Sequence, residues 1–235
     1  MKLNIVQGTA TAYPVADINI VIDVIRAFTV SHIAFMRGAR EIFLVNTVDE
    51  AFVLKAQHPK YLLAGEVAAL PITGFDLDNS PHTFSSADVD NKSLVQKTTN
   101  GVKATLLALT TLAEPTVFVT GFSNARKTAL HAKQLASSSP NCRINIIASH
   151  PQDDDDLACA EYIQDQLLGC NSIPVEAIQS RIKTARSAQK FFDPQQPEFN
   201  EKDIAFCLRE VDCDFVMQVD NNARPPRIVK QITNP

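Results

Sequence analysis

The fold is decided by the segment Ile18-Asn19-Ile20-Val21-Ile22-Asp23-Val24-Ile25, an almost unbroken apolar run that is rich in β-branched residues. Such a run is typical of a strand that is buried on both faces of a parallel sheet. Apolar residues then recur at helical spacing as far as Phe35, and Gly38 is a natural end for that helix. The segment therefore predicts a buried strand that passes directly into a helix, with Asp23 and Arg26 at the junction.

The same arrangement of apolar strand, short polar loop and helix recurs along the chain. It is present after residues 24, 97, 119 and 148, and each connection is long enough for a parallel β-α-β unit. The chain ends with strands over 215–219 and 227–232, which we expect to form an antiparallel or edge pair. The sequence therefore predicts an α/β fold with a mostly parallel or mixed sheet and a C-terminal strand pair.

The composition is that of a globular protein with a sizeable core. Of 235 residues, 45% are hydrophobic and 20% are charged, and no low-complexity linker divides the chain. We therefore expect one domain over residues 1–235, with a C-terminal extension from about residue 172. The net charge of -4 argues against a partner such as nucleic acid or an acidic membrane.

The sequence also indicates a cytoplasmic protein. No stretch is long and apolar enough to span a membrane, and the first residues lack a sustained apolar signal region. The five cysteines are scattered and odd in number, which makes a poor disulfide framework and a poor zinc signature. This use of cysteine fits a reducing compartment.

Residues 64–81 form an irregular polar segment in the middle of the chain. Glycines and prolines occur in it at close intervals, as is usual in a surface turn or a site loop. Glu66, Asp76, Asp78 and Asn79 make it rich in oxygen atoms, which hard cations such as Mg²⁺ prefer. A solvated loop with Asx turns is the alternative interpretation.

The loops that follow the strands are expected to gather at the carboxyl ends of the sheet, where ligands bind in open α/β folds. Helix N-termini at this edge carry free N–H donors and partial positive charge, which favour phosphate. The sequence contains neither a glycine-rich phosphate loop with its lysine nor a dinucleotide fingerprint. A nucleotide-binding enzyme therefore has little support.

Six polar segments, taken together and in order, carry a resemblance to a known family. They are residues 22–27 (Ile-Asp-Val-Ile-Arg-Ala), 63–66 (Leu-Ala-Gly-Glu), 74–81 (Gly-Phe-Asp-Leu-Asp-Asn-Ser-Pro), 98–101 (Thr-Thr-Asn-Gly), 123–125 (Ser-Asn-Ala) and 155–160 (Asp-Asp-Leu-Ala-Cys-Ala). Residues 203–208 also fit, so the resemblance covers nearly the whole chain. The set resembles the 2-phosphosulfolactate phosphatases, and the block at 74–81 is its most specific part.

The resemblance implies a three-layer α/β/α fold and Mg²⁺-dependent hydrolysis of a phosphate monoester. The family's named substrate is 2-phosphosulfolactate, which gives sulfolactate on the route to coenzyme M. We therefore expect Mg²⁺ as the cofactor, a small-molecule phosphate ester as the ligand, and a homodimer as a possible assembly.

The chain departs from the family pattern at Phe28, Val67, Asp78 and Glu161. Val67 stands where the family usually has arginine, which pairs with anions through two hydrogen bonds in a way that valine cannot. Asp78 replaces a glycine and adds negative charge where an anion should approach. These departures bear on the choice of substrate, 2-phosphosulfolactate or a related 2-phospho acid, more than on the chemistry. The alternative reading is a non-catalytic relative of the same fold that binds a small anion.

The resemblance assigns roles to particular residues. The expected metal ligands are Asp23, Glu66, Asp76, Asp155 and Asp156. The expected catalytic residues are Asp23, Arg26, Glu66 and Asn100, with Arg26 holding the phosphate. The residues expected to bind the substrate are Asn79, Ser80, Thr98, Thr99, Gly101, Ser123 and Asn124. A metal-activated water is the simpler nucleophile, and a phospho-aspartate at Asp23 stays open.

These candidates also have ordinary structural explanations. Asp23 and Arg26 could form an ion pair, and the polar residues at 99–100 and 123–124 could cap helices. The four aspartates at 153–156 are a favourable, solvated start for a helix.

A predicted helix over 177–191 carries basic residues on one face, which is most simply a solvated face. These residues are Arg181, Lys183, Arg186 and Lys190. The lone His150 follows an apolar strand and is more often structural than functional in such a position.

Overall fold

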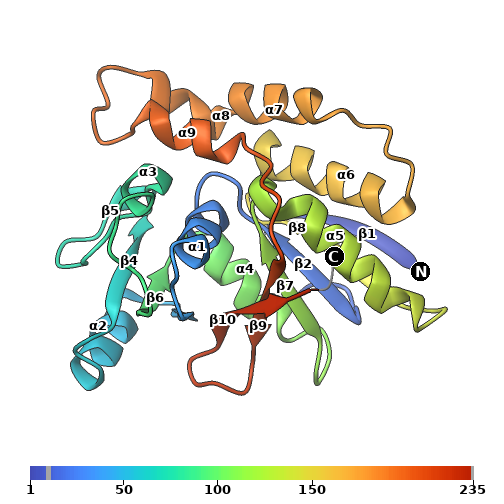
Figure 1. Cartoon of the computed structure of the whole chain (residues 1–235), viewed down its shortest axis with the longest axis horizontal. Helices are drawn as coiled ribbons and strands as arrows, with labels where there is room; N and C mark the ends of the chain where they lie inside the picture. Colours follow the sequence, from blue (N-terminus) through green and yellow to red (C-terminus); the bar gives the residue numbers. More distant parts are fainter. Residues whose placement is uncertain (9–11, 234–235) are drawn as a thin grey trace.

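The structure is a computed structural model that describes residues 1–8 and 12–233. Within these residues, ten strands form one mixed sheet, which together with the helices confirms the predicted α/β fold (Figure 1). In the order in which they lie side by side, the strands are β1 (Lys2–Gln7), β8 (Arg143–Ala148), β2 (Ile18–Ile22), β7 (Thr116–Thr120), β9 (Phe215–Asp220), β10 (Arg227–Ile232), β3 (Glu41–Leu44), β6 (Ser93–Lys97), β4 (Leu62–Val67) and β5 (Leu70–Pro71).

Helices connect most of these strands. They are α1 (Ala27–Met36), α2 (Val48–Gln57), α3 (Pro81–Phe84), α4 (Gly101–Ala108), η1 (Phe122–Asn124), α5 (Ala125–Ser137), α6 (Asp154–Leu168), α7 (Val175–Thr184), α8 (Arg186–Gln189), η2 (Lys190–Phe192) and α9 (Glu201–Cys207). Residues 82–92 are polar and show no periodicity in the sequence, which indicates a loop, but α3 extends into them. It forms because Ser80 accepts the Thr83 amide at 3.1 Å and Pro81 occupies its first turn.

Strand β2 explains the apolar run on which the fold prediction rests. It pairs in parallel with β8 and with β7, so that Ile20 aligns with Ile146 and with Phe118. Val21 joins the core around α1, whereas Ile20 and Ile22 join the core beneath α5 and α6. Because consecutive side chains of a strand point to opposite faces, a strand covered on both faces needs an apolar residue at almost every position.

Strands β9 and β10 form the predicted antiparallel C-terminal pair, and they lie inside the sheet instead of at its edge. Strand β9 pairs antiparallel with β7, and β10 pairs antiparallel with β3. On one side lie the parallel strands β1, β8, β2 and β7, and on the other lie the parallel strands β3, β6 and β4. The hairpin thus joins two parallel groups that run in opposite directions.

The twist of the sheet accounts for how two opposed groups can serve one site. Adjacent strands rotate by about 20–25°, so the six steps from β2 to β4 accumulate roughly 120–150°. This rotation turns the carboxyl ends of the second group back toward those of the first. Asp23, which follows β2, and Glu66, which lies in β4, therefore line the same cavity.

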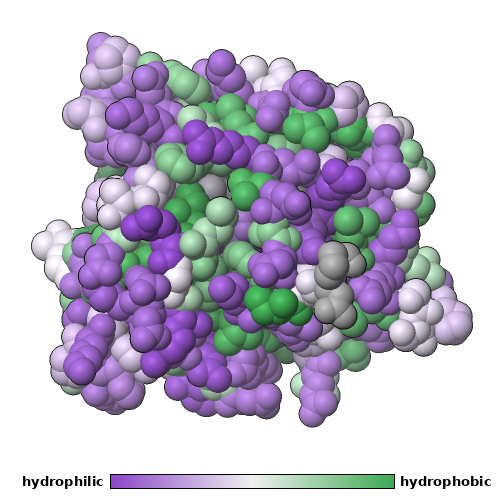
Figure 2. All heavy atoms as spheres, in the orientation of Figure 1, coloured by the Kyte–Doolittle hydropathy of each residue, from purple (hydrophilic) through white to green (hydrophobic). Residues whose placement is uncertain are grey.

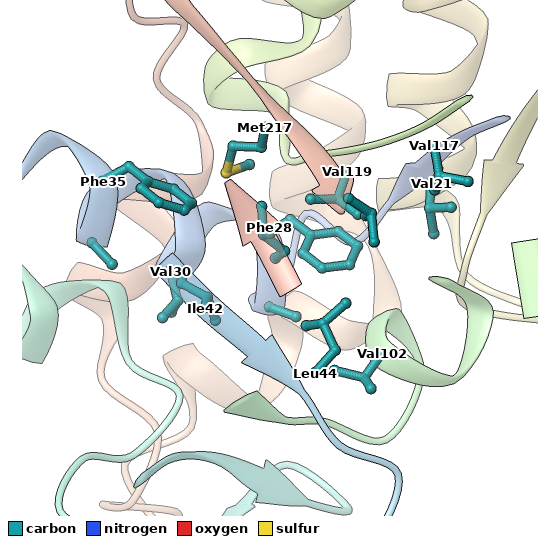
Figure 3. Close-up of a cluster of buried hydrophobic side chains, with 14 of the residues drawn as sticks. Val21, Phe28, Val30, Phe35, Ile42, Leu44, Val102, Val117, Val119 and Met217 are labelled. Carbon is teal, nitrogen blue, oxygen red and sulfur yellow. The ribbon is translucent and has the colours of Figure 1, made fainter. Parts of the chain in front are cut away.

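The main core lies between the two groups of strands and surrounds α1 and α4, which occupy the middle of the molecule in Figure 1. Figure 3 shows Phe28, Val30 and Phe35 of α1 among side chains from β2, β3, β7, β9 and α4. Helices α5 and α6 cover the other face of the first group, and α2 covers the other face of the second group. Helices therefore lie both between the groups and outside them.

The helix predicted over 177–191 is divided in the structure. Helix α7 ends at Thr184, Ala185 is extended with ψ of 150°, and α8 and η2 follow. Asp153 accepts the amides of Arg186 and Ser187 at 3.0 and 2.6 Å and so fixes α8 against the start of α6. This break changes the direction in which the later basic residues point.

Hydrophilic residues cover much of the face shown in Figure 2, with smaller apolar patches between them. The five cysteines are free, and Cys159 and Cys207 are buried as expected for small apolar residues. Among the described residues, no helix is both long enough and apolar enough to cross a membrane.

We predict that Met217→Ala lowers the free energy of unfolding by about 2–5 kcal/mol, because it leaves a cavity where β9 joins the two groups of strands. Met36 is the matched control, since it is 52% exposed and its replacement by alanine should cost less than about 0.5 kcal/mol. Urea unfolding followed by circular dichroism measures both effects. Equal effects would contradict the central position of the hairpin.

Candidate active site

A cavity of about 490 Å³ lies at the carboxyl ends of β2, β4 and β6. Its wall is assembled from the β2–α1 junction, the end of β4, the loop before α3, the β6–α4 junction, the β8–α6 loop, and α8 with η2. Six of the residues predicted from the sequence line it, namely Asp23, Arg26, Glu66, Asn79, Thr99 and Asn100. The strand-end loops therefore do gather at one place, as the fold prediction required.

Asp23 is held where two helices begin. It is only 7% exposed, and its Oδ1 accepts the amide of Ala27, the first residue of α1, at 2.9 Å. A Cβ on Gly101 would lie 2.7 Å from Asp23 Oδ2, so only glycine lets α4 begin this close to the carboxyl group. The positive ends of α1 and α4 therefore converge on Asp23.

Asp155 and Asp156, in the first turn of α6, are buried next to Asp23. Ser149 Oγ connects Asp156 with Asp23, at 2.9 and 3.5 Å from the two carboxyl groups. Asp156 also accepts the Val24 amide at 2.8 Å. Asp155 Oδ1 is buried and has no hydrogen-bond partner among the described residues. The end of the four-aspartate run is thus buried beside Asp23 and not solvated, because it faces the β2–α1 junction, although Asp155 and Asp156 do not themselves line the cavity.

Burial and mutual repulsion raise the pKa values of all three carboxyl groups. The pKa of Asp23 rises to about 8, first through burial and then through the charge of Asp156. The pKa of Asp156 rises to about 8 and that of Asp155 to about 7, again mainly through burial. Because the folded state holds these protons more tightly than the unfolded chain, stability is lost as pH rises from about 4 toward 8.

Glu66 is fixed at the end of β4 by three donors. Thr99 donates its amide to one oxygen and its hydroxyl group to the other, the hydroxyl contact being 2.9 Å, and Ala69 donates its amide. Thr98 Oγ1 accepts the Val102 amide at 3.1 Å and so caps α4. In the structure, the hydroxyl groups of Thr98 and Thr99 therefore hold a helix start and a carboxylate.

Arg26 pairs with Asp203, not with Asp23. Its Nη1 lies 2.8 Å from Asp203 Oδ2, and its Nη2 donates to the Ala69 carbonyl at 3.1 Å. The guanidinium carbon lies 4.9 Å from the ring centre of Phe191. The ion pair with Asp23 that the sequence suggested is thus corrected to a buried pair with α9.

Asp203 ties three segments together from a fully buried position. Besides Arg26, it accepts the Ser80 hydroxyl at 2.6 Å and the His82 amide at 3.0 Å. Because Asn79 precedes Ser80 and lines the cavity, this network fixes both Arg26 and Asn79 at the wall. Sequence reasoning missed the role of Asp203, because it arises from a contact across 177 residues.

Two amide side chains in the wall are free to bind a ligand. Asn79 is buried, and its Oδ1 has no hydrogen-bond partner within residues 1–8 and 12–233. Asn100 precedes α4, yet its side chain makes no capping hydrogen bond. The capping explanation that the sequence offered therefore does not apply to the side chain of Asn100.

Asp76 lies outside the cavity wall. It is exposed, and its Oδ2 accepts the Leu63 amide at 2.8 Å and the Lys55 ammonium group at 3.0 Å. It therefore braces the loop against β4. The two departures from the family pattern in this loop do not line the cavity either, and Val67 is 45% exposed.

Ser123 and Asn124 are also away from the cavity, buried beneath the end of β7. Ser123 Oγ lies 2.8 Å from His32 Nδ1. Asn124 Oδ1 accepts the Thr120 hydroxyl at 2.9 Å and the Gly121 amide at 3.3 Å. The helix cap that the sequence offered as a structural explanation describes Asn124, whose side chain accepts the amide of Gly121 at the start of η1.

Arg186 and Lys190 line the cavity, where the sequence predicted a solvated face. Neither forms an ion pair with any residue that the structure describes. Burial and the nearby charge of Arg26 lower the pKa of Lys190. His150 lines the same cavity, and burial lowers its pKa. The break at Ala185 had no clear sequence signal, so the turn of these cations toward the site was missed.

Within residues 1–8 and 12–233, the cavity thus combines buried carboxyl groups with cations that form no ion pair and with amide groups that have free oxygen or nitrogen atoms. Within the described residues, no three His, Cys, Asp or Glu side chains come together as a ready-made metal site. A sequence model described as 2-phosphosulpholactate phosphatase matches residues 4–222 of the chain. The chain belongs to the 2-phosphosulfolactate phosphatase family. This membership confirms the expected class, a phosphoric monoester hydrolase.

Members of the family from distant bacteria resemble the chain over much of its length. A Bacillus subtilis protein named probable 2-phosphosulfolactate phosphatase is 51% identical over 232 residues, which cover 99% of this chain and 100% of the relative. A protein of the same name from Caldicellulosiruptor saccharolyticus is 30% identical over 83% of this chain and 86% of its own length. One from Deinococcus radiodurans is 37% identical over 58% of this chain and 55% of its own.

We predict that Asp203→Ala lowers the free energy of unfolding by about 3–5 kcal/mol, because it leaves the buried Arg26 charge without a partner. Asp88→Ala is the matched control, since Asp88 also pairs with a cation, Lys92, but its side chain is 82% exposed. The control should cost less than about 1 kcal/mol. Unfolding in guanidinium chloride measures both free energies. An effect of Asp203→Ala as small as that of the control would contradict a stabilising role of the Arg26–Asp203 ion pair.

Proposed function

We propose that this protein catalyses the Mg²⁺-dependent hydrolysis of 2-phosphosulfolactate to sulfolactate and phosphate. The observation that carries the proposal is one cavity in which the carboxyl group of Asp23, whose pKa is raised, shares a wall with Arg186 and Lys190, two cations without an ion-pair partner among the described residues. The substrate is the one in the names of the bacterial relatives. Its phosphate, carboxylate and sulfonate groups need both a metal ion and fixed cations for neutralisation.

Asp23 and Asp155 are the residues that would hold Mg²⁺. Their oxygens are the hard donors that this ion prefers, and Asp155 Oδ1 lacks any other partner among the described residues. A complete protein cage is unnecessary, because Mg²⁺ is commonly held by one or two carboxylates, water and a substrate phosphate. When bound, the ion would neutralise phosphoryl oxygens and lower the pKa of a bound water. Its charge would also relieve the repulsion among the three carboxyl groups.

The chain's own groups would position the ester. Asn100, at the start of α4, and Asn79 have free amides in the wall and would bind phosphoryl oxygens. Arg26 would present its guanidinium group beside them, held in place by Asp203. In the reaction, the oxygen of water bonds to phosphorus, the bond from phosphorus to the C2 oxygen breaks, and that oxygen takes up a proton.

We predict that the purified protein releases phosphate from 2-phosphosulfolactate in Mg²⁺ and not in EDTA. Asp23→Asn should reduce kcat by about 100-fold or more, because it removes a carboxylate that faces the reacting group. Asp88→Asn makes the same chemical change at an exposed site and should leave kcat unchanged. The assay compares 2-phosphosulfolactate with 2-phospholactate and phosphoglycolate.

Release of phosphate that persists in EDTA would contradict the metal requirement. The absence of turnover on every ester would contradict the enzymatic proposal. In that case the chain would be a non-catalytic relative that binds a small anion.

A further inference from the structure

We propose that Arg186 and Lys190 form the subsite for the sulfonate group, and so select esters that carry a second strong acid beside the phosphate. The inference deepens the proposed function and rests on it. It concerns which protein groups meet which part of the substrate.

The first argument is the balance of charge around the cavity. The charge of Arg26 is already neutralised by Asp203, at 2.8 Å. Two carboxylates in the wall accept hydrogen bonds from amide and hydroxyl donors and, among the described residues, do not pair with the other cations, Glu66 from three donors and Asp153 from the amides of Asp154, Arg186 and Ser187. Of the cations that line the cavity, Arg186 and Lys190 are therefore left for a ligand, within the part of the chain that the structure describes.

The second argument is that Lys190 is fixed before a ligand arrives. Its Nζ lies 4.5 Å from the ring centre of Phe199 and 5.7 Å from that of Phe191. The side chain is half-buried and forms no ion pair with any described residue, and a cation buried in this way loses hydration. An anion in the cavity would compensate for the hydration that Lys190 has lost, so the position favours a negatively charged ligand group.

The third argument assigns the sulfonate, not the phosphate, to these cations. The phosphate must lie near Asp23 and Asn100, where the hydrolysis proposed above takes place. A sulfonate is a weakly basic monoanion and a poor ligand for Mg²⁺, so it depends on cations of the protein. Arg186 and Lys190 belong to a separate segment, α8 with η2, which Asp153 anchors to the start of α6.

The test compares two esters that differ only in the sulfonate, 2-phosphosulfolactate and 2-phospholactate. For the wild-type protein, kcat/KM should favour 2-phosphosulfolactate. In Lys190→Met, the ratio of the two kcat/KM values should fall by about 10- to 100-fold, the size expected for loss of one charge-assisted hydrogen bond. Lys183→Met is the matched control, since Lys183 is exposed and outside the cavity.

A ratio that stays constant in Lys190→Met would overturn the inference, whether or not both activities fall. If the wild-type protein hydrolyses neither ester, the proposed function fails, and calorimetric titration with sulfolactate then decides the subsite. Binding that Lys190→Met weakens by about 10-fold or more would support the subsite. Equal binding by both proteins, or none by the wild type, would overturn it.

Discussion

The burial of three neighbouring carboxyl groups, to which their mutual repulsion adds, is the constraint on which the site depends. Asp23, Asp155 and Asp156 meet where β2 and β8 end, and burial keeps water from screening their charges. Backbone amides, some of them at the N-termini of helices, donate hydrogen bonds to the carboxyl groups and offset part of the cost of burying them. Because Gly101 has no side chain, α4 can begin close to the Asp23 carboxyl group. The remaining unfavourable charge is what makes a bound cation the natural completion of the site.

The sheet determines which residues can share that site. Its two parallel groups run in opposite directions, and the β9–β10 hairpin joins them through antiparallel pairs. Twist then brings Glu66 and Asn100 from the second group to Asp23 of the first. Helices η2 and α9 close the arrangement by adding Lys190 and Asp203, which come from the last third of the chain.

The sequence was most informative where local pattern decides structure. The apolar run of β2 predicted the buried strand, and the loop positions of Asp23, Glu66 and Asn100 predicted that they would meet. Residue type alone could not separate Asp76 and Asn124, which brace a loop and a turn, from residues in the wall. Asp203 and Lys190 were missed because their positions depend on long-range contacts and on the backbone break at Ala185, which no periodicity reveals.

The melting temperature measured against pH, with and without Mg²⁺, tests the central claim most directly. The account predicts that the metal-free protein loses stability between about pH 5 and about pH 8, as the three carboxyl groups ionise. Mg²⁺ should raise the melting temperature more at the higher pH, and Asp155→Asn should weaken both effects. A melting temperature that Mg²⁺ leaves unchanged at about pH 8 would contradict the account, because it would show that the ionised carboxyl groups do not bind the cation.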